Sequence, residues 1–144
     1  MKVHVKISEE YTDPYAVIYT NQMTDDIQRL IKTIEADKKH LLVDDKNKIS
    51  IIKIEDIYMV RVENGETAIY GKDKCYYSRE RLYAVKEKLG SQFMQISKST
   101  LINLTRMDNI EAGFNGTLVL KLQNGCKDYV TRTYLKDFKS YLGL

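Results

Sequence analysis

The side chains that could carry catalytic chemistry are few and scattered in this 144-residue sequence. His4 and His40 are its only histidines, and neither lies in a zinc-binding pattern such as HExxH. Cys75 and Cys126 are its only cysteines and form no CxxC pair, so we expect two reduced, half-buried thiols. We find no phosphate-binding glycine loop, no GxSxG motif and no obvious pair of carboxylates. The sequence therefore predicts no enzymatic activity, no metal and no cofactor.

Long cationic side chains are the remaining candidates for chemistry, and they gather in the C-terminal part of the chain. Residues 1–46 carry 7 Lys and Arg against 9 Asp and Glu, a net charge of −2. Residues 47–144 carry 16 Lys and Arg against 11 Asp and Glu, a net charge of +5. Such a basic excess suits a phosphate-bearing partner, although many ordinary domains carry the same charge.

The first 46 residues predict a small unit that combines strands with one helix. Apolar and polar residues alternate over residues 2–7, and residues 15–20 also have the composition of a short strand. The N-terminal alternation differs from the pattern of a signal peptide. No apolar run is long enough to span a bilayer, so we expect a cytoplasmic protein.

A helix is predicted over residues 24–36. Its apolar residues recur at helical spacing and form one stripe: Ile27, Leu30, Ile31 and Ile34. Thr24 can cap the first turn, and Lys38 and Lys39 suit the other end. Because the stripe needs a cover, we expect residues 1–46 to mediate dimerisation or partner binding. Packing of the stripe on the β domain, or on the unit's own strands, is the alternative.

From residue 47 onward the pattern changes to short strands joined by turns. Strands are predicted at residues 41–43, 49–54, 57–62, 67–70, 74–78 and 118–122, and the polar residues 44–48 predict a hinge or a hairpin turn. Three Asn-Gly pairs, at residues 64–65, 115–116 and 124–125, predict tight turns with positive φ. Apolar stripes predict two helices, one after Ser78 that ends at Gly90 and one after Thr133 that closes the chain.

Several segments of residues 47–144 follow one another in an order that resembles the LytTR family of bacterial response-regulator output domains. They include Ile54–Tyr58 and Tyr77–Leu82, with Leu89 closing the helix. Phe93–Asn103 has the sequence FMQISKSTLIN, where the family usually has FxRIHRSxLVN. Near the end, TRTYLK over residues 131–136 stands where the family usually has SRxYxK. The departures at Gln95 and Ser97 concern base preference rather than the fold.

The resemblance implies a mainly β domain of the α+β class. In that family, short antiparallel strands form an elongated array with two short helices, and here the small αβ unit of residues 1–46 would precede it. Loops at the edge of the array, and not a recognition helix, enter successive major grooves of DNA. A loop that carries one long basic side chain can reach a guanine edge or a phosphate.

Three segments match the contacting loops of the family. The first is the hairpin of residues 63–67, with Asn64, Glu66 and Thr67; the second is Ser97-Lys98; the third is Arg132 at the start of the last helix. Each has a structural alternative, because the Asn-Gly pair suits a plain hairpin turn and Glu66 would repel phosphate. Lys98 could be an ordinary solvated lysine, and Arg132 could pair with a nearby aspartate. Four further cations could contact phosphates or simply form a charged face: Lys72, Lys74, Arg79 and Arg81.

Residues 1–46 are too few for the phosphoacceptor domain that often precedes this family's domain, and they resemble the N-terminal unit of stand-alone regulators from Gram-positive bacteria. The resemblance therefore implies double-stranded promoter DNA with repeated half-sites as the ligand, a homodimer, and a small membrane protein as antagonist. A protein-interaction module that keeps the β fold without reading DNA is the competing hypothesis. The presence of Lys98 and Arg132, together with the charge of +5, favours DNA.

Overall fold

The computed structural model describes residues 1–12, 14–35 and 40–144. Its helices are α1 (Asp25–Glu35), α2 (Leu82–Leu89) and α3 (Arg132–Leu142), and three 3₁₀ turns cover Ile54–Asp56, Leu104–Arg106 and Phe114–Gly116. Its strands are β1 (His40–Asp45), β2 (Lys48–Lys53), β3 (Met59–Glu63), β4 (Glu66–Tyr70), β5 (Cys75–Ser78), β6 (Phe93–Ser97), β7 (Thr100–Asn103), β8 (Met107–Ala112), β9 (Leu118–Leu122) and β10 (Lys127–Val130). The predicted α+β class, mainly β with two short helices in the C-terminal part, is confirmed.

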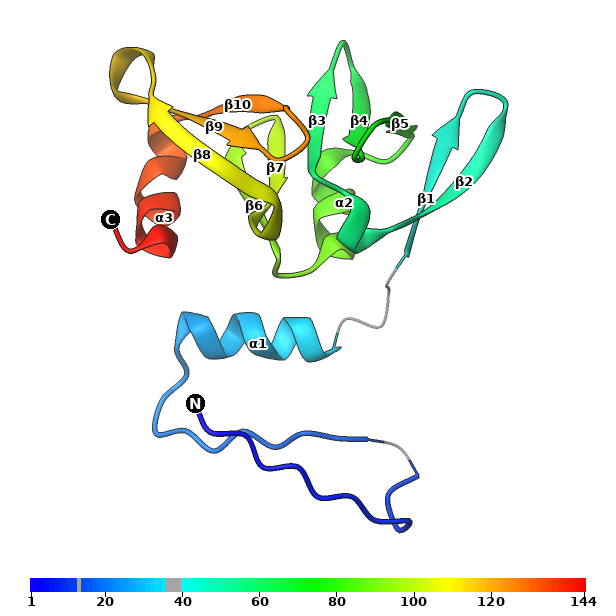
Figure 1. The fold of residues 1–144 in the computed structure, drawn as a ribbon, viewed down its shortest axis with the longest axis vertical. Helices are drawn as coiled ribbons and strands as arrows, with labels where there is room; N and C mark the ends of the chain where they lie inside the picture. Colours follow the sequence, from blue (N-terminus) through cyan, green and yellow to red (C-terminus); the bar gives the residue numbers. More distant parts are fainter. Residues whose placement is uncertain (13, 36–39) are drawn as a thin grey trace.

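The strands form two antiparallel sheets (Figure 1). The larger sheet has seven strands in the order β2-β1-β5-β4-β3-β7-β6, and the smaller sheet has three in the order β10-β9-β8. Hairpins join β1 to β2, β3 to β4, β6 to β7 and β8 to β9. Short hairpin connections suit antiparallel strands, and they place the loops along the edges of the sheets.

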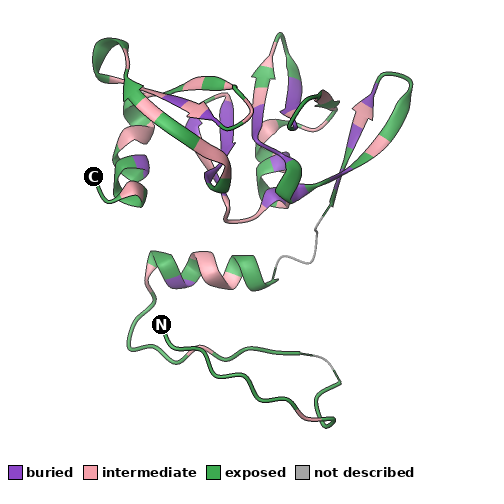
Figure 2. Ribbon diagram, viewed as in Figure 1, coloured by how far each residue is buried: buried purple, intermediate pink, exposed green. Residues whose placement is uncertain are grey.

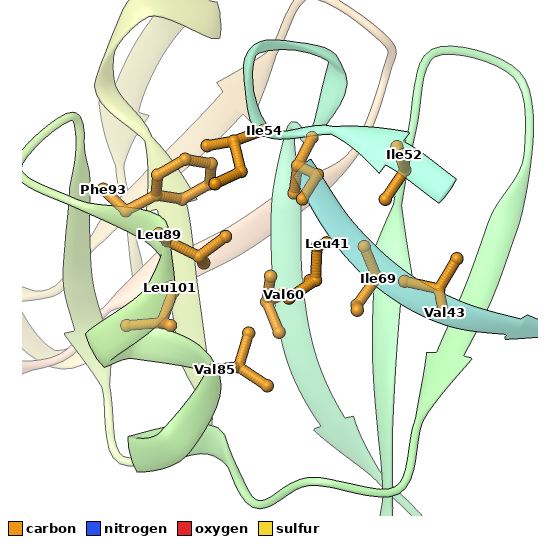
Figure 3. Close-up of a cluster of buried hydrophobic side chains, with 11 residues drawn as sticks. Leu41, Val43, Ile52, Ile54, Val60, Ile69, Val85, Leu89, Phe93 and Leu101 are labelled. Carbon is orange, nitrogen blue, oxygen red and sulfur yellow. The ribbon is translucent and has the colours of Figure 1, made fainter. Parts of the chain in front are cut away.

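The first hydrophobic core lies between the larger sheet and α2 (Figure 3). Val85 and Leu89, four residues apart on α2, are 0% and 2% exposed and meet strand residues from across the sheet. The strand and turn residues of this core are Leu41, Val43, Ile52, Ile54, Ile57, Val60, Ile69, Phe93 and Leu101. Gly90 follows α2 with φ 83°, so the predicted end of this helix at Gly90 is confirmed.

A second core lies between the opposite face of the central strands, the smaller sheet and α3. Phe138 of α3 is fully buried there, among side chains of β3, β6, β7, β9 and β10. On β3 and β7, Met59 faces Ile102 on this side of the sheet, whereas the next pair, Val60 and Leu101, faces the first core. Strands β3 and β7 are therefore buried on both faces, which explains their nearly continuous apolar composition.

Polar contacts centred on Arg61 of β3 connect the two sheets. The guanidinium donates to Glu63 at 2.7 Å and to the Tyr70 hydroxyl at 3.3 Å, and it lies 3.5 Å from the carboxylate of Asp128 on β10. Thr100 of β7 donates to the same carboxylate at 2.6 Å. Burial, reinforced by the carboxylate of Glu63, raises the pKa of Tyr70 to about 12, so the phenol remains a proton donor in this cluster.

The Asn-Gly turns were predicted correctly in two cases and in part in the third. Asn64 and Gly65 both have positive φ between β3 and β4, as do Asn115 and Gly116 between β8 and β9. In the third pair only Gly125 has positive φ. The connection between β9 and β10 is four residues long, and in a loop of that length the left-handed conformation falls on the third residue, Gly125, and not on Asn124.

The N-terminal arm, residues 1–12 and 14–24, forms no strand, so the strands predicted at residues 2–7 and 15–20 are wrong for the single chain. The arm is extended and runs on the far side of α1 from the two sheets (Figures 1 and 2). Alternation fits an extended backbone, but a strand also needs a neighbouring strand to bond its N–H and C=O groups. Among the described residues of the arm, the backbone bonds are local turns such as Tyr11 to Ser8.

Helix α1 forms close to where it was predicted. Its first turn is capped by Thr24, whose hydroxyl accepts from the N–H of Ile27 at 3.3 Å. The predicted helix end at Ala36, with Lys38 and Lys39, lies outside the described residues. The stripe is covered only in part: Ile27 is buried, whereas Ile34 is 52% exposed.

The predicted turn at residues 44–48 is a hairpin turn, with Lys46 at φ 57°. Strand β1 before the turn pairs with β2 after it along six residue pairs and also contacts β5. Strand pairing therefore joins residues 40–45 to the larger sheet of the C-terminal part. The predicted boundary at residue 46 falls in the middle of this hairpin.

Candidate nucleic-acid interface

An open groove of about 1040 Å³ brings most of the predicted contact residues together. It runs between the β3–β4 hairpin, the segment that connects β5 to α2, and the β6–β7 turn. Five of the predicted residues line it: Lys98, Glu66, Thr67, Arg79 and Arg81. Asn64 and Ser97 are each next in sequence to a lining residue, and Arg132 lies outside the groove. The groove thus joins two of the three predicted loops to the two arginines.

Lys98 occupies the tip of the β6–β7 turn and its side chain is exposed. The turn is held from inside, because the N–H of Ser99 donates to the Ser97 hydroxyl at 3.3 Å and the carbonyl of Ser99 accepts from the N–H of Val62 at 2.9 Å. Ser97 itself is only 8% exposed. These contacts fix the backbone under Lys98 and leave its ammonium in solvent, free to reach a phosphate or a base edge.

Thr67 and the tip of the β3–β4 hairpin have different environments. Thr67 is 5% exposed, and its hydroxyl donates to the carbonyl of Glu80 at 2.8 Å, which fastens β4 to the segment before α2. Asn64 and Glu66, by contrast, are exposed at the hairpin. The carboxylate of Glu66 therefore lines the groove as a negative charge, where it opposes a phosphate.

The predicted phosphate-contacting cations divide into paired and accessible ones. Arg79 is 92% exposed but pairs with Asp44 at 3.2 Å, and Lys74 pairs with the buried carboxylate of Asp45 at 2.5 Å. None of the ion pairs among the described residues uses Arg81 or Lys98. Arg81, which directly precedes α2, is thus the more available of the two predicted arginines.

Lys86 is a groove cation that sequence reasoning missed. It lies on α2, lines the groove with Arg81 and Lys98, and donates from its ammonium to the side-chain carbonyl of Gln95 at 3.2 Å. The sequence feature that could have indicated Lys86 is its position directly after Val85, because a helical residue next to a buried one points away from the core. Only the placement of α2 beside β6 shows that this exposed face borders the groove.

Arg132 is the first residue of α3 and is exposed. Its Nε atom donates to the carbonyl of Asn115 at 2.9 Å, so the side chain reaches the β8–β9 loop and does not pair with Asp128 or Asp137. The guanidinium keeps further N–H donors beyond this bond. The preceding residue, Thr131, donates its N–H to the carbonyl of Ile96 at 3.0 Å. Arg132 and Lys98 thus extend from backbones joined at the end of β6.

Both thiols are free and half-buried, as predicted, and burial raises the pKa of Cys75 and of Cys126.

Among the described residues, no three His, Cys, Asp or Glu side chains come together in an arrangement that could hold a metal ion. No described helix has the length and apolar character needed to cross a membrane. What the described surface offers is a set of cations on loops of a β fold, and that arrangement is typical of proteins that bind phosphate backbones.

The fold and the cationic loop edge together define a DNA-binding domain of the β type. Residues 47–143 match the LytTr DNA-binding domain family, and the chain belongs to that family. The LytTr DNA-binding domain of a Bacillus cereus protein has a similar structure, with a TM-score of 0.69, 16% sequence identity, and coverage of 74% of this chain and 99% of that one. At that identity the match supports the fold alone.

Relatives with similar sequences extend beyond this domain. A protein of Staphylococcus aureus strain bovine RF122, named an uncharacterized HTH-type transcriptional regulator, is 30% identical over the whole chain and over 99% of its own length. The sensory transduction protein LytT of Enterococcus faecalis is 35% identical over 100 residues, which are 69% of this chain and 41% of that protein. The match with the Staphylococcus protein therefore includes the N-terminal residues of this chain.

Proposed function

We propose that this protein is a transcription regulator that recognises promoter DNA sequence-specifically through loops of its β fold, with Lys98 and Arg132 as the principal reading residues. Membership in the LytTR DNA-binding family supports DNA as the ligand. The observation that carries the assignment of residues is the bond between Thr131 and Ile96, because it holds the segments that bear both cations at one end of β6.

The two cations have different chemical capacities. Arg132 can present a planar pair of donors to the O6 and N7 atoms of a guanine, while Lys98 can donate to a base or to a phosphate as a compact charge. The place of Arg132 at the start of α3 adds backbone N–H groups that favour a nearby phosphate. In the groove, Arg81 and Lys86 supply phosphate contacts that position the domain without reading bases.

Titration against the protein's own promoter tests this function. The full chain is mixed with duplexes that tile the promoter and with scrambled duplexes of equal length, at several salt concentrations. We expect at least one promoter fragment to bind clearly more tightly than its scrambled counterpart at every salt concentration. Equal binding to all duplexes would reduce the protein to a non-specific DNA binder, and no binding at low salt would refute DNA recognition.

We further propose that the protein acts as a homodimer on repeated half-sites, with the N-terminal residues as the dimerisation element. Their net charge of −2 makes them a poor surface for DNA, and α1 leaves Ile34 exposed. A truncated chain that begins at His40 keeps the β1–β2 pairing. We expect it to be monomeric in light scattering while the full chain has twice the monomer mass; a monomeric full chain would refute the dimer.

The stand-alone regulators that this chain resembles also imply a small membrane protein as antagonist. Within this proposal, the antagonist would bind the N-terminal residues, because the DNA-reading loops lie on the other part of the chain. Co-purification of the full chain, but not of the truncated chain, with the membrane protein encoded beside it tests this partner. Co-purification of both chains with the membrane protein would instead place the antagonist's binding site on the DNA-binding domain.

A further inference from the structure

The N-terminal arm exposes an unusual amount of apolar surface. The accessible surface of the chain is 10780 Å². A compact monomer of 16.8 kDa would expose about 7,650 Å², so the excess is about 3,100 Å². A stable dimer buries about 800 Å² on each partner, so this excess is more than a dimer interface requires. The arm contributes eight large apolar side chains that are each at least 57% exposed: Met1, Val3, Val5, Ile7, Tyr15, Val17, Tyr19 and Met23.

A second exposed apolar surface lies at the outer edge of the larger sheet, where no strand among the described residues pairs with the free side of β2. Its outer face carries Ile49 and Ile51, each 70% exposed, and Leu42 of β1, which is paired with Ile51, is 65% exposed. We call these three residues the β2 edge patch. An exposed apolar edge strand is a template for pairing with another chain, and proteins normally cover or charge such an edge.

Residues 15–20 of the arm have the pattern that fits this edge. Tyr15, Val17 and Tyr19 alternate along the chain, so in an extended strand they lie on one face. The segment contains no charged residue, which matters because Lys48 and Lys53 at the ends of β2 would repel a basic strand. The other half of the arm, residues 2–7, carries Lys2 and Lys6 and is therefore the poorer match.

The segment is tethered on the side of the fold away from the β2 edge of its own chain. Arg29 of α1 lies over the ring of Tyr141 on α3, at 5.8 Å, and α3 contacts β6, the opposite edge of the seven-stranded sheet from β2. Six strand spacings separate the two edges by about 29 Å along the sheet. Only residues 21–24 join the segment to α1, and the five Cα–Cα steps from Thr20 to Asp25 span at most about 18 Å, well short of that separation.

We propose that residues 15–20 of one copy add as a strand to the free edge of β2 in a second copy, beside its β2 edge patch. The exchange is reciprocal, so a two-fold axis relates the two copies, and the β2 edge of each copy is closed by the arm of the other. The added strand supplies backbone partners for β2, and its apolar side chains lie beside Ile49 and Ile51 on the same face of the sheet. This inference rests on the homodimer proposed above and names the surfaces that form it.

Light scattering of the full chain gives the first test. We expect twice the monomer mass for the unmodified chain and the monomer mass for the Ile49→Lys/Ile51→Lys variant, which places two charges on the edge. Tyr129→Lys, at a half-exposed strand position of the smaller sheet, is the matched control and stays dimeric. Melting temperatures confirm that all three chains are folded. A dimeric edge variant, or a monomeric unmodified chain, would overturn the proposal.

Disulfide cross-linking identifies the contact itself. In a chain with Cys75→Ala and Cys126→Ala, Val17→Cys and Ile51→Cys mark the middles of the two strands. We expect the double variant to form a cross-linked dimer and neither single variant to do so. Cross-linking by Val17→Cys alone indicates pairing between arms, and an oxidised monomer of the double variant indicates a contact within one chain; either result refutes the exchange.

Failure of this inference can be told apart from failure of DNA recognition. The edge variant is titrated with short random duplex at low salt, where binding depends on the groove cations and not on paired half-sites. If the edge variant keeps both its affinity for the duplex and its dimer mass, the strand exchange alone is rejected. If the unmodified chain binds no duplex, the proposed DNA function fails whatever its mass.

Discussion

Thr131 donates its backbone N–H to the carbonyl oxygen of Ile96 at 3.0 Å. Its hydroxyl also donates to that oxygen at 3.4 Å, so two donors of one residue converge on the end of β6. Lys98 lies two residues after Ile96, and Arg132 lies one residue after Thr131. Two cations that are 34 positions apart in sequence are thus fixed along one edge of the fold, where a single DNA duplex could contact both.

Lys98→Ala and Arg132→Ala should each weaken binding to the true promoter fragment more than binding to scrambled DNA. Loss of a two-donor contact with guanine costs about 1–3 kcal/mol of discrimination. Both side chains are exposed, and Arg132 loses only one exposed hydrogen bond, to the carbonyl of Asn115, so the melting temperature should change little. Each variant is titrated against both duplexes, with Lys32→Ala in α1 as a control cation outside the groove. Unchanged promoter affinity in both variants would show that the reading edge lies elsewhere.

Lys86→Ala should weaken binding to all duplexes by a similar factor. Lys86 lines the groove beside Lys98, and a phosphate contact carries no sequence information. The plot of log affinity against log salt concentration should become shallower by about 0.9 for the one phosphate released. A change of preference between duplexes, with the salt slope unaltered, would instead place Lys86 at a base.

Glu66→Gln should strengthen binding to random duplex at low salt. The carboxylate lines the groove among the cations and opposes phosphate, and the amide removes that charge with little change of shape. The gain should fade as salt rises, because screening weakens the repulsion in the unmodified protein. Weaker binding by the variant, confined to one promoter sequence, would reveal Glu66 as an acceptor for a cytosine amino group.

Asp45→Asn should lower the stability of the protein at neutral pH, and the difference from the unmodified chain should shrink in acid. The hydrogen bond from Lys74 holds the pKa of Asp45 below its ordinary value of 3.8. A depressed carboxyl pKa contributes stability above the unfolded pKa and loses it as pH falls through the folded pKa. Urea unfolding at pH 7 and at pH 3 measures this; a difference that stays constant with pH would exclude the ion pair as its cause.

Asn103→Ala should destabilise the fold by about 1–3 kcal/mol, because it leaves a buried carbonyl without its donor. The fully buried amide donates to the carbonyl of Ile57 at 2.8 Å and accepts from the N–H of Thr105 at 3.0 Å. Chemical denaturation of the variant gives the loss. Thr105→Ala keeps the amide and should cost less; equal losses would assign the effect to the Thr105 hydroxyl.

The local elements of the C-terminal part and the identity of its family follow from the sequence. Alternation of apolar residues marks a buried face whatever the partner, which is why β2, β3 and β9 were predicted. Glycine at positive φ is a local requirement, and it placed the end of α2 at Gly90 and the hairpin at Asn64-Gly65. The order of motifs around Lys98 and Arg132 indicates the family, because that order is a property of the chain and needs no knowledge of its contacts.

Which backbones lie side by side depends on the tertiary structure. Alternation does not say which strand provides hydrogen-bond partners, so residues 2–7 and 15–20 were predicted as strands that the single chain does not form, while His40–Asp45 joined a sheet across a predicted boundary. Burial of the Thr67 hydroxyl and the place of Lys86 in the groove likewise depend on how α2 and the segment before it pack on the sheet. Such contacts join residues far apart in sequence, and their free energy is gained only when the whole fold is assembled.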